Sequence, residues 1–148
     1  MSSTILKIIP TIPSFVPDNI KKDNARSFLN KLYTNEQVEF ITTDTIEFVD
    51  QGENFETVSC NLCGHNIEIE DWQNLMDSKY KNQFANLTFI TACCNKTTSL
   101  NNLNYKWPAG FAKFVVSISD AQSELTERDL IELQDILGTT ARIIWAHY

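Results

Sequence analysis

The 148-residue sequence is poor in basic residues, in histidine and in long apolar stretches. Twelve lysines and arginines stand against nineteen aspartates and glutamates, and the formal net charge is −7. Nucleic acids and anionic lipid surfaces are bound by basic patches, so we expect neither a nucleic acid nor a membrane as partner. No stretch approaches about 18 consecutive apolar residues, which argues against a transmembrane helix.

Motifs that carry familiar catalytic chemistry are also missing. The chain contains no GxSxG turn, no P-loop, no glycine-rich dinucleotide fingerprint and no HExxH pair. The deaminase pattern, HxE followed by PCxxC, is absent as well. We therefore expect a protein that is not an enzyme, and enzymatic activity is the less favoured alternative.

The expected compartment decides how the four cysteines are interpreted. The first ten residues lack a basic opening followed by a long apolar run, so they do not resemble a secretory signal. We therefore expect a cytoplasmic protein whose cysteines are reduced. In that setting, metal binding is favoured over disulfide formation.

Alternating or β-branched apolar residues predict strands near both ends of the chain. The predicted strands cover residues 4–9, 38–42, 111–118 and 141–148. Residues 45–49 either extend the second strand or fold back on it. The last strand is apolar on both faces, which implies that something covers the sheet on each side.

Helical periodicity predicts one helix after the strand over 4–9 and another after the strand over 111–118. Apolar residues at i, i+3, i+4 and i+7 over 25–32 form a single stripe, and Asp18 is a suitable N-cap. Thr126 and Asp129 resemble a capping box before the second helix, and Gly138 suits its C-terminal end.

Without residues 51–107, the predicted order is strand, helix, strand, strand, helix, strand. This order is typical of a ferredoxin-like sandwich in the α+β class. We therefore expect residues 1–50 and 108–148 to form the sandwich, and residues 51–107 to form an inserted zinc-ribbon-like module. The insertion falls between the second and third strands, where an exposed hairpin tip tolerates additional chain. Within it we expect a helix over 72–80, a strand over 87–91 and a polar loop over 95–104.

The first cysteine pair has the form of a zinc knuckle. In Cys60-x-x-Cys63 two thiolates lie on one tight turn, and the following Gly64 permits the positive φ that such a turn requires. Two other interpretations stay open. In the first, the cysteines are buried as small apolar residues and bind nothing. In the second, the pair is a redox motif, although a redox CxxC normally opens a helix.

The second pair, Cys93-Cys94, follows after 29 residues at the end of a predicted strand. Adjacent side chains in an extended strand point to opposite faces, so both reach one ion only if the chain bends sharply there. His65 is the natural substitute ligand if one of the two thiols does not bind. The expected cofactor is a structural Zn²⁺ held by Cys60, Cys63, Cys93 and Cys94.

Several segments together resemble a family of small uncharacterised bacterial proteins, and the cysteine segment resembles zinc ribbons in general. The segments are Cys60-Asn-Leu-Cys63-Gly64, Thr91-Ala-Cys93-Cys94, the WPAGF motif at 107–111, and Ile144-Trp-Ala-His-Tyr148. The likeness covers nearly the whole chain. It implies a zinc site and a bacterial cytosolic setting, and it brings no activity with it. A glycine often follows the adjacent cysteines in that family, whereas this sequence has Asn95.

Aromatic residues gather around the end of the insertion and on the last strand. Tyr105, Trp107, Phe111 and Trp145 form either an exposed interaction patch or the contacts that pin the insertion against the sandwich. We favour the second interpretation, because a small metal module needs apolar neighbours.

These observations lead to three functional hypotheses. The favoured one is a non-catalytic cytosolic zinc-binding protein that acts through a protein partner. The second is a small acidic inhibitor or immunity-type protein that neutralises a basic partner by charge. The third is a zinc-dependent hydrolase or deaminase with three thiolates and a water on the metal, and Glu68, Glu70 or Asp71 as base.

Overall fold

A four-stranded antiparallel sheet forms the centre of the fold in the computed structural model, which describes residues 3–148. From one edge to the other its strands are β2 (Gln37–Val49), β7 (Gly110–Ser119), β1 (Thr4–Pro10) and β8 (Ala141–His147). Every neighbouring pair is antiparallel. The predicted α+β class is therefore confirmed.

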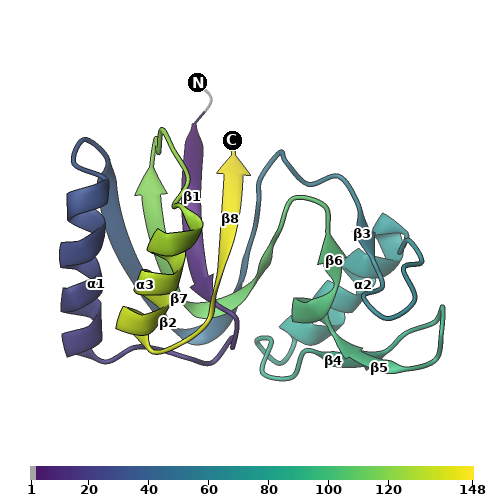
Figure 1. Cartoon of the computed structure of the whole chain (residues 1–148). Helices are drawn as coiled ribbons and strands as arrows, with labels where there is room; N and C mark the ends of the chain where they lie inside the picture. Colours follow the sequence, from purple (N-terminus) through teal and green to yellow (C-terminus); the bar gives the residue numbers. More distant parts are fainter. Residues whose placement is uncertain (1–2) are drawn as a thin grey trace.

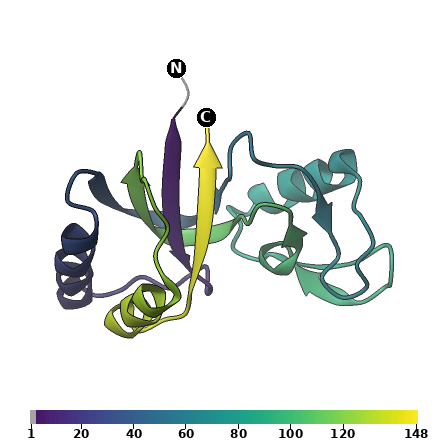
Figure 2. The ribbon, with the colours of Figure 1, turned by 45° about the horizontal axis from the view of Figure 1, so that its top comes forward.

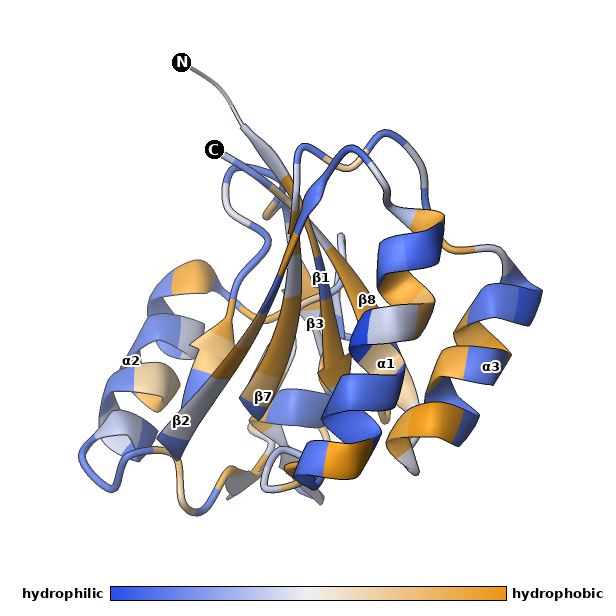
Figure 3. Ribbon diagram, turned by 90° about the vertical axis from the view of Figure 1, so that its left-hand side faces the viewer, coloured by the Kyte–Doolittle hydropathy of each residue, from blue (hydrophilic) through white to orange (hydrophobic). Residues whose placement is uncertain are grey.

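Helices α1 (Asn19–Leu32) and α3 (Glu127–Leu137) cover one face of this sheet (Figure 1). Figure 3 shows the largely apolar strands β1, β7 and β8 behind the two helices. The core between them contains mainly aliphatic residues: Leu6, Ile8, Ala25, Leu29, Phe114, Val116, Ile118, Leu133 and Leu137. Among residues 3–148, no helix is both long enough and apolar enough to cross a bilayer.

The predicted helix caps are confirmed. A side-chain oxygen of Asp18 accepts a hydrogen bond from the backbone N–H of Lys21 at 2.9 Å. The hydroxyl of Thr126 accepts from the backbone N–H of Asp129 at 3.1 Å, and α3 ends at Gly138 with φ of +78°. These contacts satisfy backbone groups that a helix end leaves without partners, so they fix where both helices begin and where α3 ends.

Residues 45–49 extend β2 and do not fold back. The pairing of β2 with β7 shifts register between Thr42 and Glu47, as in a β-bulge. Inside this irregularity the Thr43 hydroxyl donates to the carbonyl of Thr45 at 2.7 Å. Beyond it the ladder resumes and ends at Val49, which is paired with Gly110.

Residues 50–109, called the insert below, leave the sheet between β2 and β7. They contain β3 (Val58–Ser59), α2 (Ile69–Tyr80), β4 (Thr88–Ile90), β5 (Thr97–Ser99), the short helix η1 (Leu100–Asn102) and β6 (Asn104–Tyr105). Figures 1 and 2 show the insert on the side of the sheet away from α1 and α3. Strand β3 pairs with β6, and β4 pairs with β5, in two separate two-stranded sheets.

The prediction of a polar loop over 95–104 is wrong, because this stretch contains β5, η1 and the start of β6. Its polar side chains are partly buried and make tertiary hydrogen bonds, which composition does not reveal. The Thr98 hydroxyl donates to Oδ1 of Asn61 at 2.7 Å. The side chain of Asn101 donates to the carbonyl of Thr11 at 3.1 Å and accepts from the backbone N–H of Phe111 at 2.9 Å.

A second hydrophobic cluster joins the insert to the sheet. Its buried members are Val58, Trp72, Phe84, Leu87, Leu100, Leu103, Tyr105, Ala109 and Phe111. Phe48 projects into it from β2, with its ring centroid 5.7 Å from that of Trp72 on α2. Phe111 projects from β7, 5.1 Å from Phe84. The insert is therefore packed against the end of the sheet and is not a free-standing appendage.

Candidate metal centre

The first cysteine turn closes in the way its sequence predicts. The backbone N–H of Gly64 donates to the carbonyl of Cys60 at 2.9 Å, and Gly64 has a φ of +79°. Just outside the turn, the N–H of Cys60 donates to the carbonyl of His65 at 2.9 Å. A β-carbon at Gly64 would meet no heavy atom within 4 Å, so the glycine serves the backbone conformation and not a close approach.

The second turn repeats the first with different side chains. The N–H of Asn95 donates to the carbonyl of Thr91 at 2.9 Å, and Asn95 has a φ of +57°. The N–H of Thr91 donates to the carbonyl of Lys96 at 2.9 Å. Asn95 therefore takes the place of the glycine, which a left-handed asparagine can do.

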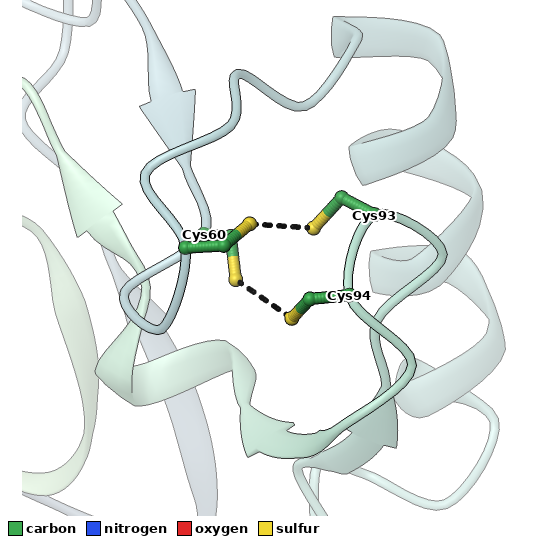
Figure 4. A group of neighbouring side chains, drawn as sticks. Cys60, Cys93 and Cys94 are labelled. Atoms are coloured by element: carbon green, nitrogen blue, oxygen red, sulfur yellow. Dashed lines mark hydrogen bonds between the residues drawn. The ribbon is translucent and has the colours of Figure 1, made fainter.

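Superposing the two hydrogen-bond patterns by sequence position relates Cys94 to Cys63 and Thr91 to Cys60. Cys93 then occupies the position of Leu62, which carries no ligand in the first turn. Because residues 92–94 form a turn and not an extended strand, the adjacent side chains are no longer forced to opposite faces. Figure 4 shows Cys93 and Cys94 both directed from their loop toward Cys60.

The four thiols converge on one point. Their Sγ atoms all lie within 4.8 Å of one another. The Sγ–Sγ distance is 3.3 Å between Cys63 and Cys93 and 3.9 Å between Cys60 and Cys94. A tetrahedron with metal–sulfur bonds of about 2.3 Å has edges of about 3.8 Å, and a disulfide bond is only about 2.05 Å long. The four cysteines are free thiols that lie close enough together to hold one metal ion.

The centre is buried on one side and open on the other. Cys60 is fully buried and Cys94 half-buried, whereas Cys63 and Cys93 are exposed. On the buried side, the Thr91 hydroxyl lies 3.0 Å from Sγ of Cys94. Such outer hydrogen bonds orient the sulfur atoms that would bind a metal.

Local hydrogen bonds give the thiols unequal acidities. The backbone N–H of Leu62, 3.4 Å from Sγ of Cys60, lowers the pKa of Cys60 to about 7, against the opposing effect of burial. The hydrogen bond with Cys63, together with desolvation, raises the pKa of Cys93 to about 12. Without a metal, the site thus holds an acidic thiol at Cys60 and a protonated thiol at Cys93.

The two histidines lie outside the group of converging donor atoms. His65 follows the first turn, is exposed, and lines a cavity beside Cys93. His147 on β8 has its Nδ1 3.3 Å from the hydroxyl of Thr4. The substitute-ligand role predicted for His65 finds no support in this geometry, because the sharp turn brings both Cys93 and Cys94 to the centre.

The predicted aromatic patch divides into buried and exposed members. Tyr105 is 9% exposed and Phe111 is fully buried. The Tyr105 hydroxyl donates to the carbonyl of Leu100 at 2.7 Å. These two residues belong to the core that holds the insert against the sheet, so a four-residue surface patch is wrong. The hydrophobic cluster that encloses them explains the difference, and the favoured pinning interpretation describes their position.

Trp107 is exposed and Trp145 is half-buried, and both line an open hollow with Asn54 and Glu124. Trp107 is 45% exposed and has a φ of +61°, which is unusual for a bulky residue. Each indole N–H donates to a carboxylate: Trp107 to Glu56 at 3.1 Å, and Trp145 to Glu124 at 2.6 Å.

A cavity of about 490 Å³ opens directly beside Cys93, and sequence reasoning did not anticipate it. It lies between the chain that leaves the first turn, the first two turns of α2, and the end of β4. Glu68 and Asp71, considered above as catalytic bases, line this cavity, whereas Glu70 does not belong to its lining. In the sequence, the apolar lining of this cavity is present only as the separate residues Ile67, Leu75 and Phe89, which no local pattern connects.

In comparisons with known proteins, no family model matches this chain, and neither the curated proteins nor the solved structures provide a match.

Proposed function

We propose that Cys60, Cys63, Cys93 and Cys94 bind one Zn²⁺ ion in a structural site. The observation that carries the proposal is the convergence of four thiols within 4.8 Å of one another. Soft thiolate donors in tetrahedral geometry are typical of Zn²⁺ and of iron bound by sulfur. Two CxxC-like turns that face one another favour zinc, since this is how zinc ribbons are built.

A closed site favours structure over catalysis. A catalytic zinc keeps one coordination position for water or substrate, usually beside three protein ligands. Four protein thiolates fill a tetrahedron. The hydrolase or deaminase hypothesis would require one thiol to leave the metal, and it is therefore the least favoured of the three.

The metal's task is to join two separate hairpins. The first turn follows β3 and the second connects β4 to β5, and no β-ladder links these two sheets within residues 3–148. Zinc would cross-link them at their tips. Metal binding and folding of the insert would then be coupled.

We further propose that the protein acts by binding another protein in a reducing, cytoplasmic compartment. A metal site of four thiolates needs reduced cysteines, and all four cysteines are free. A closed site offers no chemistry of its own, and the acidic chain is unsuited to nucleic acid. Membership of the small bacterial family described above is part of this proposal.

The sheet with α1 and α3 is proposed to be a ferredoxin-like sandwich. Two observations support this. The elements β1-α1-β2 and β7-α3-β8 are each a βαβ unit, and the sheet order places β7 between β1 and β2 and β1 between β7 and β8. Two βαβ units that split one another in this way are the hallmark of that topology.

Metal analysis of the purified chain tests the zinc proposal. We expect about one zinc per chain, and visible absorption of a tetrahedral thiolate site after replacement by Co²⁺. The variant Cys60→Ser is expected to lose the metal and to unfold at a lower temperature, whereas Ser59→Ala, one residue away, keeps both. A protein purified without stoichiometric metal, or with iron and sulfide in place of zinc, would contradict the proposal.

Charge favours the acidic inhibitor as a second candidate. Within residues 3–148, Lys–carboxylate ion pairs involve only Asp50 and Glu56, so most acidic side chains are available to a basic partner. The position of the gene discriminates: an inhibitor gene lies next to that of its toxin or target enzyme. An isolated gene would count against this candidate.

A further inference from the structure

We propose that the cavity beside Cys93 is a docking groove for an extended, basic segment of a partner protein, which adds to β4 as a new strand. We call it the β4 groove, and its boundaries are residues 65–68, 71, 75 and 89–93. The inference rests on the interaction part of the proposed function and makes it specific. It concerns the protein surface and not the identity of the metal.

The size and lining of the β4 groove suit a ligand. Its volume of about 490 Å³ lies in the range of established binding pockets, which are mostly apolar with a few polar groups. Ile67, Leu75 and Phe89 supply half-buried apolar surface. Ile90 contributes a side chain that is 67% exposed, on a strand whose other edge is already paired.

One wall of the groove is the unpaired edge of β4. Leu100 N–H donates to the carbonyl of Leu87, and Thr91 N–H donates to the carbonyl of Lys96. These bonds place the backbone groups of residues 87, 89 and 91 toward β5. Since antiparallel strands alternate, the N–H and C=O of Ile90 point the other way, toward the groove.

The chain that leaves the first turn also lines the groove, and an isolated bridge between Ser59 and Asn66 holds it to β3. Cys60 N–H donates to the carbonyl of His65, and Ile67 N–H donates to the carbonyl of Val58. The backbone groups of Asn66 therefore point away from β3, and Asn66 lines the groove. A hollow lined by the unpaired edge of β4 and by further backbone groups that point away from their own ladder is suited to a main chain more than to a small molecule.

Charge selects a basic segment. Glu68 and Asp71 line the groove, and within residues 3–148 neither has a lysine, arginine or histidine nitrogen within 4 Å. Cys93, a member of the cysteine centre, is a further lining residue. Four thiolates and one Zn²⁺ sum to a charge of −2 at that end. A strand with lysine or arginine between apolar residues would present its cations here and its apolar side chains to Phe89 and Leu75.

Selection from a displayed library of short random peptides tests the inference on the full, zinc-loaded protein. Counter-selection uses the double variant Glu68→Gln/Asp71→Asn. We expect enriched sequences in which lysine or arginine alternates with β-branched or aromatic residues. The best peptide, synthesised and labelled, should bind the wild type more weakly as salt rises.

Three variants separate the parts of the argument. Ile90→Pro removes the N–H that points into the groove while leaving the β4–β5 ladder intact, and should weaken the peptide by about tenfold. Ile90→Ala keeps the N–H and should weaken it less. Glu68→Gln/Asp71→Asn should weaken it by about tenfold, whereas the matched pair Glu39→Gln/Asp44→Asn on β2 should change nothing.

Metal content of every variant distinguishes the two proposals. Stoichiometric zinc with no enriched peptide, or with peptides that bind Ile90→Pro as well as wild type, would overturn the groove alone. Peptides that bind as described to a protein without zinc would overturn the zinc proposal alone. Enrichment of acidic or uncharged sequences would contradict the charge argument and with it the inference.

Discussion

Thr91 is the residue that makes the second cysteine turn differ from the first. It stands where Cys60 stands in the first turn, yet a threonine hydroxyl is a poor ligand for a soft metal site. Its side chain is buried, lies 3.0 Å from Sγ of Cys94, and accepts from the N–H of Lys96 at 3.2 Å. The missing thiol comes instead from Cys93, two residues further along the chain. Thr91 thus keeps the shape of the turn while Cys93 supplies the sulfur.

The acidities of the thiols make metal binding depend on pH. A thiolate binds the metal and a thiol does not, so protons and metal compete for the same sulfur atoms. With the pKa of Cys60 at about 7 and that of Cys93 raised to about 12, metal binding must displace protons at neutral pH. We expect the affinity to fall by about tenfold per pH unit, on lowering the pH, for each thiol that is still protonated. Competition with a chelator at several pH values measures this. An affinity independent of pH near neutrality would contradict it.

The element that recurs in the insert is a short hairpin whose tip is closed by a left-handed residue. In one case this residue is Gly64, and in the other it is Asn95. The two hairpins come from distant parts of the insert. They meet at their tips, through the hydrogen bond from Thr98 to Asn61, and through the second hydrophobic cluster beneath them. Since the turns share one backbone geometry, their ligand positions are interchangeable in principle.

Moving the fourth thiol tests this equivalence. Cys93→Ser is expected to lower zinc affinity by at least about a hundredfold, because one ligand is lost. Thr91→Cys combined with Cys93→Ser recreates a CxxC in the second turn and should recover most of the affinity. The matched variant Ala92→Cys/Cys93→Ser places the thiol at a position that carries no ligand in the first turn, and should recover none. Chelator competition and Co²⁺ absorption report the outcome. A Thr91→Cys/Cys93→Ser protein as weak as Cys93→Ser would show that the turns are not equivalent.

Features that depend on neighbouring residues were predictable from the sequence. The caps at Asp18 and Thr126 and the left-handed residue Gly64 follow from local chemistry, and the elements they bound were predicted correctly. The convergence of four thiols also followed from their number and from the CxxCG pattern. Whether Cys93 and Cys94 point the same way did not follow, because it depends on a turn closed by Asn95 and on a hydroxyl from Thr91.

Features that depend on distant contacts were predicted only in outline: the role of Tyr105 and Phe111 in pinning the insert was the favoured expectation, but their partners were not predicted. Tyr105 and Phe111 carry no local sign of burial, and their place in the core is decided by Trp72, Phe84 and Phe48 from other elements. The predicted strand over 87–91 is present as β4, whereas β3, β5 and β6 are only two or three residues long, too short for a period of two to be recognised. The β4 groove is formed by the chain after the first turn, the start of α2 and the end of β4, so it exists only in the folded chain.

On the scale of the whole molecule, Arg142 fastens the insert to the sheet. From β8 its guanidinium Nη1 donates to the carbonyl of Asn101 at 3.0 Å and to that of Ala109 at 2.8 Å. Gly110 leaves room for it, since a β-carbon there would lie 2.7 Å from the same nitrogen. Arg142 and the second hydrophobic cluster thus both hold the insert to strands that are far away in sequence.

Replacing Arg142 should therefore weaken the junction. Arg142→Met keeps much of the side-chain length but leaves the carbonyls of Asn101 and Ala109 without their donor. We expect the free energy of unfolding to fall by roughly 3 kcal/mol, measured by urea denaturation. Faster hydrogen exchange in η1 and β6 than in α1 would locate the change. The control Arg128→Met, at an exposed position on α3, should stay within about 0.5 kcal/mol of wild type. An Arg142→Met protein as stable as this control would contradict the assignment.

Because Val49 pairs with Gly110, a metal bound at the four cysteines would contribute to the stability of a sheet that it does not contact. Those two residues close a loop of sixty residues, which an unfolded insert would have to span as flexible chain. Closing such a loop costs about 3.5 kcal/mol of chain entropy, whereas a tight two-residue turn costs well under 1 kcal/mol. A folded insert brings the two ends together in advance and removes most of that penalty from β2 and β7. Metal bound at the tips of the insert would therefore raise the free energy of unfolding of the sheet, without any displacement being transmitted through the molecule.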